Sequence, residues 1–170
     1  MAGAEGTAIA NVNLYNNTII ANGRSGIVLY GVVNGFDIAN NILDRNGTVR
    51  DDPNRTTAYG ITTDIPTLSG ARLIRYNLFH ANWTGDWSGD LDTIAASGSN
   101  IPNAASNSDP KFFNDESSDW HILSSSGAIE NGVNLYSSSS ATDYDYDSYP
   151  RASDPGVNYD IGAYVYRVLP

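Results

Sequence analysis

Ionisable side chains gather in one segment that interrupts an otherwise regular pattern. The segment spans residues 48–58 and contains Asp51, Asp52 and Arg55, and the run that follows it ends at Asp64. Glycoside hydrolysis needs two carboxyl groups roughly 5–9.5 Å apart, because one protonates the leaving oxygen while the other attacks the sugar or activates water. Asp64 with Asp51 or Asp52 would supply such a pair. We therefore take Asp51, Asp52, Asp64 and Arg55 as candidate catalytic residues.

A plainer interpretation of this insert is a solvated surface loop. Its run Asp51-Asp52-Pro53-Asn54 has the composition of a turn, and a turn needs no chemistry. Inserts in repeat folds nevertheless project from one face, which is often the binding face. Both interpretations stay open.

Aromatic side chains near the insert are candidates for binding a sugar, since their flat faces suit sugar rings. Tyr30 ends the run 26–30, Tyr59 directly precedes the matching run 60–64, and Trp83 and Trp87 lie in the Gly-containing segment 82–90. For the tryptophans the alternative is that one or both fold back onto the core, because Trp is usually highly buried.

One histidine also qualifies as a substrate-binding candidate. His80 and Asp44 fall at equivalent positions of neighbouring repeats, in a column predicted to point outward. A catalytic dyad is one interpretation of this pair, and a surface ion pair is the other.

Three alternating carboxylates near the end of the chain predict a possible calcium site. Asp143, Asp145 and Asp147 share one face of an extended segment, and oxygen-rich sets of this kind suit Ca²⁺. The segment lacks the glycine and distal glutamate of an EF-hand, so a solvated acidic turn is the alternative. We expect no other cofactor, because phosphate-loop, serine-triad and zinc spacings are absent from the sequence.

The candidate residues are placed by a repeat that carries two asparagine positions. Segments 12–22, 36–46 and 72–82 align. The aligned asparagines are Asn17, Asn41 and Asn77 at the first position, and Asn22, Asn46 and Asn82 at the second. The first step is 24 residues and the second is 36, a difference close to the length of the insert. A period in the twenties is typical of a solenoid.

Each repeat reads as three short strands, because β-branched and aromatic residues alternate with polar ones and Asn or Gly ends each run. The matching runs are 12–15 with 36–39 and 72–75, then 18–21 with 42–45 and 78–81, and 26–30 with 60–64. Three strands per turn predict an all-β, right-handed parallel β-helix whose rungs stack about 4.8 Å apart. Stacked asparagines would satisfy polar groups that the bends bury.

The alternation also assigns the inward and outward faces. We expect two inward stacks, Ile19 with Leu43 and Phe79, and Leu14 with Ile38 and Ile74. If Ile27 and Ile61 point inward as well, then Tyr30, Thr62 and Asp64 point outward. The insert would then overhang an outer groove that holds the candidate carboxylates and tyrosines.

Composition limits the partners and the organisation. The 170 residues suggest a single domain, with regular rungs over 8–106 and terminal rungs plus an irregular cap over 107–170. The net charge of −10 argues against a nucleic-acid partner. No apolar run is long enough to span a membrane. The first residues do not resemble a signal peptide.

The tail carries the most specific resemblance. Its motifs are Asp109-Pro110-Lys111-Phe112, Asp119-Trp120-His121-Ile122-Leu123, Ser126–Gly132, Asp143–Arg151 and Asp160-Ile161-Gly162-Ala163-Tyr164-Val165-Tyr166. This series resembles the ending of secreted bacterial proteins of the pectate-lyase-like β-helix superfamily. Gly127, Glu130 and Val165 depart from the residues usual there.

The resemblance implies an extracellular or cell-surface polysaccharide-associated protein. A glycoside hydrolase is the first expectation. A lyase is a lesser one, which would use Ca²⁺-holding carboxylates with a base such as Arg55. The polygalacturonase motifs Gly-His-Gly and Arg-Ile-Lys are absent from the sequence, which argues against pectin hydrolysis. A non-catalytic carbohydrate-binding module and a structural stalk are the alternatives, and an uncovered first rung predicts edge-to-edge self-association.

Overall fold

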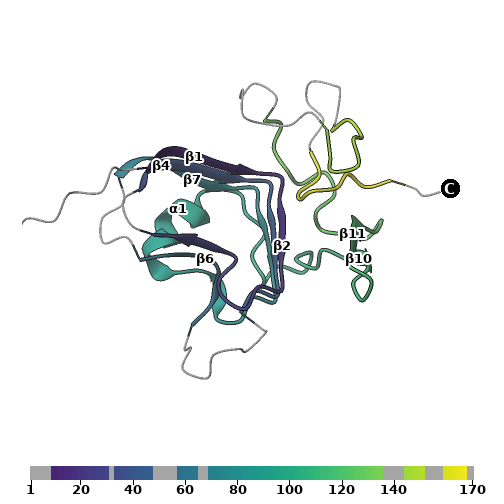
Figure 1. Cartoon of the computed structure of the whole chain (residues 1–170), viewed down its shortest axis with the longest axis horizontal. Helices are drawn as coiled ribbons and strands as arrows, with labels where there is room; N and C mark the ends of the chain where they lie inside the picture. Colours follow the sequence, from purple (N-terminus) through teal and green to yellow (C-terminus); the bar gives the residue numbers. More distant parts are fainter. Residues whose placement is uncertain are drawn as a thin grey trace, which may run out of the picture.

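The computed structural model describes residues 9–30, 33–47, 57–64, 69–135, 144–151 and 159–167. These residues form an almost entirely β structure (Figure 1). The strands are β1 (Ile9–Tyr15), β2 (Thr18–Ile20), β3 (Ile27–Leu29), β4 (Val33–Ala39), β5 (Ile42–Asp44), β6 (Tyr59–Thr63), β7 (Ser69–Arg75), β8 (Leu78–His80), β9 (Gly85–Trp87), β10 (Phe112–Asn114) and β11 (Asp119–Ile122). A 3₁₀ turn, η1 (Gly89–Leu91), and one short helix, α1 (Asp92–Ala96), follow β9.

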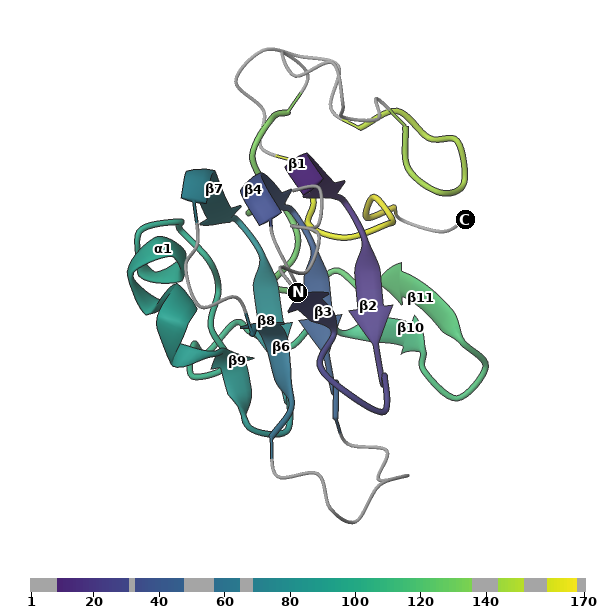
Figure 2. The same ribbon diagram turned by 60° about the vertical axis from the view of Figure 1, so that its left-hand side comes forward.

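Nine of the strands form three parallel sheets of three strands each. The strand orders are β1-β4-β7, β2-β5-β8 and β3-β6-β9, so each strand pairs with the third strand before or after it. Figure 2 shows the strands of these sheets side by side. We call each consecutive triplet, such as β1, β2 and β3, a rung. All-β character, parallel three-strand sheets and stacked rungs are compatible with a parallel β-helix.

The predicted register is confirmed strand by strand. Val12 pairs with Phe36 and Phe36 with Arg72, as the aligned segments require. Ile27 pairs with Ile61 in the third sheet. The period of the sequence therefore fixes which residues are neighbours on adjacent rungs.

Both asparagine positions form ladders. In the first, the Nδ2 of Asn17 donates to Asn41 Oδ1 at 3.0 Å, and that of Asn41 donates to Asn77 Oδ1 at 2.9 Å. The first ladder continues into Asn100, whose Oδ1 accepts from Asn77 at 3.0 Å. Asn100 lies after α1 and not on a strand, so strand alignment did not find it.

The second ladder has the same pattern of bonds. Nδ2 of Asn22 donates to Asn46 Oδ1 at 3.0 Å, and Nδ2 of Asn46 donates to Asn82 Oδ1 at 2.9 Å. These amides stabilise sharp bends: Ala21, Arg45 and Ala81, which precede the ladder residues, have φ near +50° (50°, 51° and 49°). A left-handed residue other than Gly costs about 1–2 kcal/mol, and the bonds of the ladder offset that cost.

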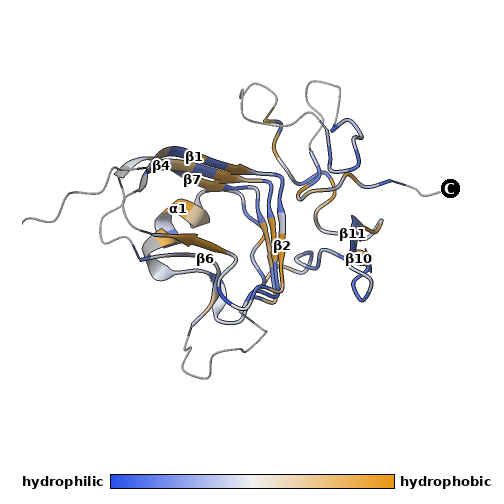
Figure 3. Ribbon diagram, viewed as in Figure 1, coloured by the Kyte–Doolittle hydropathy of each residue, from blue (hydrophilic) through white to orange (hydrophobic). Residues whose placement is uncertain are grey.

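The inward stacks are buried as predicted in the second and third rungs. Leu43, Phe79, Ile38 and Ile74 are each 0 % exposed. They belong to one core cluster against which residues of the first rung pack. Figure 3 shows apolar residues along the sheets that enclose this interior. Burying one such side chain contributes about 1.5–3 kcal/mol.

The C-terminal part of the chain covers the outer face of the sheet β2-β5-β8 (Figure 1). Ile42 and Leu78 point away from the core and are also buried, in a second cluster with residues of the tail, namely Ile101, Ile122, Ala128 and Ile161. Backbone contacts fix this docking, because Gly162 N donates to Asn40 O at 2.8 Å. The central strand of this sheet, β5, is therefore buried on both faces.

That docking corrects one expectation. We predicted that Asp44 lies on an open outer surface, but its exposure is only 1 %. The alternation placed its side chain outward correctly, yet the β10–β11 hairpin and the preceding segment cover it. Alternation within a strand predicts the direction of a side chain, but it does not predict which other segment covers that side chain.

The two ends of the stack differ. At one end the loop after α1 adds to the last rung, since Gly98 O accepts from Tyr76 N at 2.8 Å. At the other, β1, β2 and β3 pair with no further described strand. Edge-to-edge self-association therefore stays a prediction. No helix among the described residues is long and apolar enough to cross a membrane.

Candidate functional site

The predicted outer groove is described only in part. Asp51, Asp52 and Arg55 lie outside the described residues. Asp64 is exposed beyond the end of β6, and its backbone N–H donates to Leu29 O at 3.2 Å, which places it beside Tyr30. Tyr30 is 75 % exposed, so the outward direction predicted for both residues is confirmed.

The other aromatic candidates differ in their surroundings. Tyr59, at the start of β6, is half-buried. Trp83 is 48 % exposed. Trp87 packs edge-on against core residue Phe79, with ring centres 5.2 Å apart, and its Nε1 donates to Asp92 at 2.9 Å. About half of Trp83 is therefore exposed, whereas Trp87 packs against the core.

The predicted calcium carboxylates have protein partners of their own. Asp145 is buried and accepts from the backbone N–H groups of Asp147, Tyr149 and Val165. The Asp147 carboxylate instead contacts His121 and Arg167, and Asp143 lies outside the described residues. Within the described ranges, no group of three or more His, Cys, Asp or Glu side chains is arranged to hold a metal ion.

The structure brings together a different set of ionisable groups, centred on Asp44 and His80. Strands β5 and β8 pair so that these two residues are direct neighbours. Nδ1 of His80 lies 2.8 Å from Asp44 Oδ1. Nε of Arg45 donates to the other carboxylate oxygen of Asp44, also at 2.8 Å. Asp44 thus has both oxygens bonded beneath a half-exposed imidazole.

The bonding of Asp44 sets the tautomer of His80. The pKa of the Asp44 carboxyl is raised by burial, and its bonds to His80 and Arg45 offset only part of that rise. When ionised, Asp44 is only an acceptor, so Nδ1 must carry the hydrogen. Nε2 is then the basic nitrogen, and none of the described residues bonds to it. This arrangement, in which a buried carboxylate orients an imidazole, is one that general acid–base catalysis uses.

These residues line a cavity of about 270 Å³ whose opposite wall comes from the tail. We call it the His80 cavity. Its lining residues are Asp44, Arg45, His80, Asp109, Pro110, Lys111, Phe112 and Asp115. Arg45 joins the two walls, because its guanidinium pairs with both carboxylate oxygens of Asp115, one of them at 2.6 Å.

Asp109 is the second carboxylate of this cavity. Partial burial raises its pKa, but the ammonium of Lys111, 2.6 Å away, and the Lys111 backbone N–H outweigh that effect and lower it. His80 and Asp109 line the same cavity. An ionised carboxylate and a basic imidazole nitrogen therefore line one cavity.

Sequence reasoning identified half of this site. The alignment paired Asp44 with His80, but the motif Asp109–Phe112 was assigned only to the cap. Nothing in the spacing relates that motif to β5 and β8, because the docking of the tail brings them together.

Comparison with known proteins found no matching family model, no similar curated protein and no similar solved structure.

Proposed function

We propose that this chain is a right-handed parallel β-helix of the pectate-lyase-like superfamily, and that it acts on polysaccharides outside the cell. The parallel three-strand sheets and the two asparagine ladders support the fold. The resemblance of the tail motifs supports the superfamily. These motifs also pack together, since Ile161 N donates to Ala128 O at 2.9 Å and Asp160 accepts from Glu130 N at 2.8 Å.

The reaction that we propose is glycoside hydrolysis in the His80 cavity. The observation that carries it is the presence of an oriented imidazole and an ionised carboxylate in the same cavity. Protonated His80 would donate its Nε2 proton to the leaving glycosidic oxygen, and would later take a proton from water. Asp109 would stabilise or trap the positive charge that develops on the sugar ring. Asp44 would hold the imidazole through its bond to Nδ1.

The outer groove is an alternative catalytic set for the same reaction. It would use Asp64 with Asp51 or Asp52, and Arg55, next to Tyr30 and Tyr59. Substitution separates the two sets. If the His80 cavity is the catalytic one, Asp109→Asn abolishes release of reducing sugar from a panel of neutral and acidic polysaccharides, while Asp64→Asn leaves it unchanged. The reverse result would assign catalysis to the outer groove. If the unaltered chain released no reducing sugar, the proposal of glycoside hydrolysis would be disproved.

A non-catalytic glycan-binding module is the second candidate. The exposure of Tyr30 and Trp83 favours it, since exposed aromatic faces suit sugar rings. Affinity electrophoresis in gels that contain the same polysaccharides tests this function. Retardation without reducing-sugar release would favour binding alone, whereas neither retardation nor release would favour a structural stalk.

A further inference from the structure

A second cavity lies in the C-terminal region, and it shares no lining residue with the His80 cavity. It has a volume of about 190 Å³ and lies between the β10–β11 hairpin with the residues after it and the segment 165–167. We call it the cap pocket. Its lining residues are Phe113, His121, Ile122, Leu123, Ser124, Val165, Tyr166 and Arg167.

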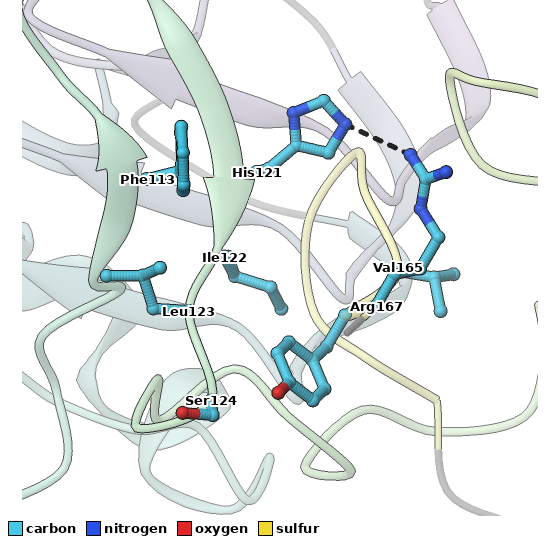
Figure 4. Close-up of a pocket in the computed structure, with 8 residues that line it drawn as sticks. Phe113, His121, Ile122, Leu123, Ser124, Val165 and Arg167 are labelled. Atoms are coloured by element: carbon cyan, nitrogen blue, oxygen red, sulfur yellow. Dashed lines mark hydrogen bonds between the residues drawn. The ribbon is translucent and has the colours of Figure 1, made fainter. Parts of the chain in front are cut away.

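The cap pocket has an apolar middle and polar ends. Figure 4 shows Ile122 and Leu123 between His121 and Arg167 on one side and Ser124 on the other. Such a layout matches a pyranose ring, which has apolar C–H faces and a rim of hydroxyl groups.

The charges at the polar end are already balanced. Arg167 Nη2 lies 2.5 Å from Asp147 Oδ2, and His121 Nε2 lies 2.8 Å from the same oxygen. His121 Nδ1 pairs with Asp119. Two groups that can be cationic thus face two carboxylates. An acidic ligand would compete with Asp119 and Asp147 for these partners, and a cationic ligand would meet Arg167, so a neutral ligand fits best.

Aromatic side chains lie against the polar end of the pocket. The Arg167 guanidinium carbon is 3.7 Å from the centre of the Tyr149 ring, Tyr164 packs against His121, and Tyr146 packs against Tyr164. Of the nine large apolar side chains that are exposed among the described residues, five lie between residues 113 and 149, namely Phe113, Leu123, Tyr144, Tyr146 and Tyr149. Phe113 itself lines the pocket and is 53 % exposed. Clustered exposed apolar side chains mark interaction sites more often than scattered ones do.

We propose that the cap pocket binds one neutral sugar residue, in contact with Phe113, Leu123 and Ile122, with hydroxyl groups directed to Ser124 and the Arg167–His121 end. This binding is independent of the chemistry proposed for His80, so either proposal can fail alone.

The test is NMR titration of the full chain with methyl glucoside, methyl galactoside and methyl mannoside, and with glucuronic acid as the charged probe. We expect saturable amide shifts at residues 121–124 and 165–167 with at least one neutral glycoside. Phe113→Ala should weaken that binding roughly three- to tenfold, as expected for the loss of one aromatic contact. Phe113 is exposed, and Leu73→Ala, on β7, is the matched control with unchanged affinity, because Leu73 is 46 % exposed and does not line the cap pocket.

Three outcomes would overturn the proposal. The first is the absence of shifts in these residues with every neutral glycoside. The second is tighter binding of glucuronic acid than of the neutral probes. The third is a set of shifts at these residues that depends on protein concentration without sugar, which would identify a second copy of the chain as the occupant. Leu123→Ser provides a second variant if Phe113→Ala fails to fold.

Discussion

His80 Nδ1 lies 2.8 Å from Asp44 Oδ1, although the two residues are 36 positions apart. The two residues are close because they lie on adjacent rungs, where β5 and β8 pair in register. The sequence separation is 36 residues because the chain between them includes the insert. The repeat that determines the fold therefore also creates the ionisable pair, and the tail that docks over it excludes solvent from Asp44.

The first asparagine ladder should contribute most to the free energy of unfolding at its buried positions. Asn41 is 0 % exposed, and its side chain bonds to the rungs on both sides. Asn41→Ala leaves several buried backbone groups without partners, so we expect a loss of roughly 2–4 kcal/mol in the free energy of unfolding. Asn17→Ala, at the exposed end of the same ladder, should cost about 1 kcal/mol or less. Urea denaturation measures both, and equal losses would contradict the ladder's role.

The docked tail should stabilise the whole chain. Ile161 is 0 % exposed and packs in the second cluster with Ile42 and Leu78. Ile161→Ala should therefore lower the free energy of unfolding by about 2–5 kcal/mol. Val28→Ala is the matched control, because Val28 is 51 % exposed and such changes usually stay within about 0.5 kcal/mol. If the tail melted separately at a lower denaturant concentration, the shared core would be disproved.

The two tryptophans of segment 82–90 should separate binding from stability. Trp87→Ala removes an aromatic contact with Phe79 and should lower Tm clearly. Trp83→Ala should leave Tm nearly unchanged and should weaken retardation in polysaccharide gels, if the exposed indole contacts glycan. Differential scanning calorimetry and affinity electrophoresis of both variants check this. A Trp83→Ala chain that binds as well as the unaltered one would remove Trp83 from the substrate-binding residues.

The pH dependence of stability should reflect His121. Burial alone lowers the pKa of this histidine, but Asp119 and Asp147 together outweigh burial and raise it. A folded-state pKa above the unfolded value means that protonated His121 favours the fold. Its contribution is complete below about pH 6.5 and disappears as the pH rises through the folded-state pKa.

The carboxylates around His121 contribute to stability at higher pH and lose that contribution in acid. The pKa of Asp119 and that of Asp147 are lowered, mainly by their bonds to His121, so their contribution is lost as the pH falls below about 3.8. The Tm difference between the unaltered chain and His121→Gln should therefore be largest between these limits. A difference that grows above neutral pH would have the wrong sign.

The sequence predicts the rungs well because side-chain identity recurs with the period of the fold. Asn41 and Asn77, or Leu43 and Phe79, occupy equivalent positions because each rung repeats the same local environment. Asn100 continues the ladder without a strand, so its role follows only from the path of the chain after α1. Sequence repeats thus predict the local geometry of the rungs, and they predict nothing about segments outside the repeats.

The candidate site is less predictable because it depends on contacts between the rungs and a non-repetitive tail. Asp109 and Lys111 reach His80 only when the tail docks on Ile42 and Leu78. Likewise, alternation gave the outward direction of Asp44 but not its burial. The outer-groove set is a proposal of a different kind, since three of its residues lie outside the described ranges.

The most direct test of the catalytic role of His80 is the reducing-sugar release rate of His80→Asn on the best polysaccharide from the panel. The asparagine amide can still donate to Asp44, so the buried carboxylate keeps a partner while the basic Nε2 is lost. We predict a rate loss of roughly 10²–10⁴-fold with Tm nearly unchanged. A His80→Asn chain that folds normally and cleaves at the unaltered rate would contradict the assignment of His80 as the acid–base residue.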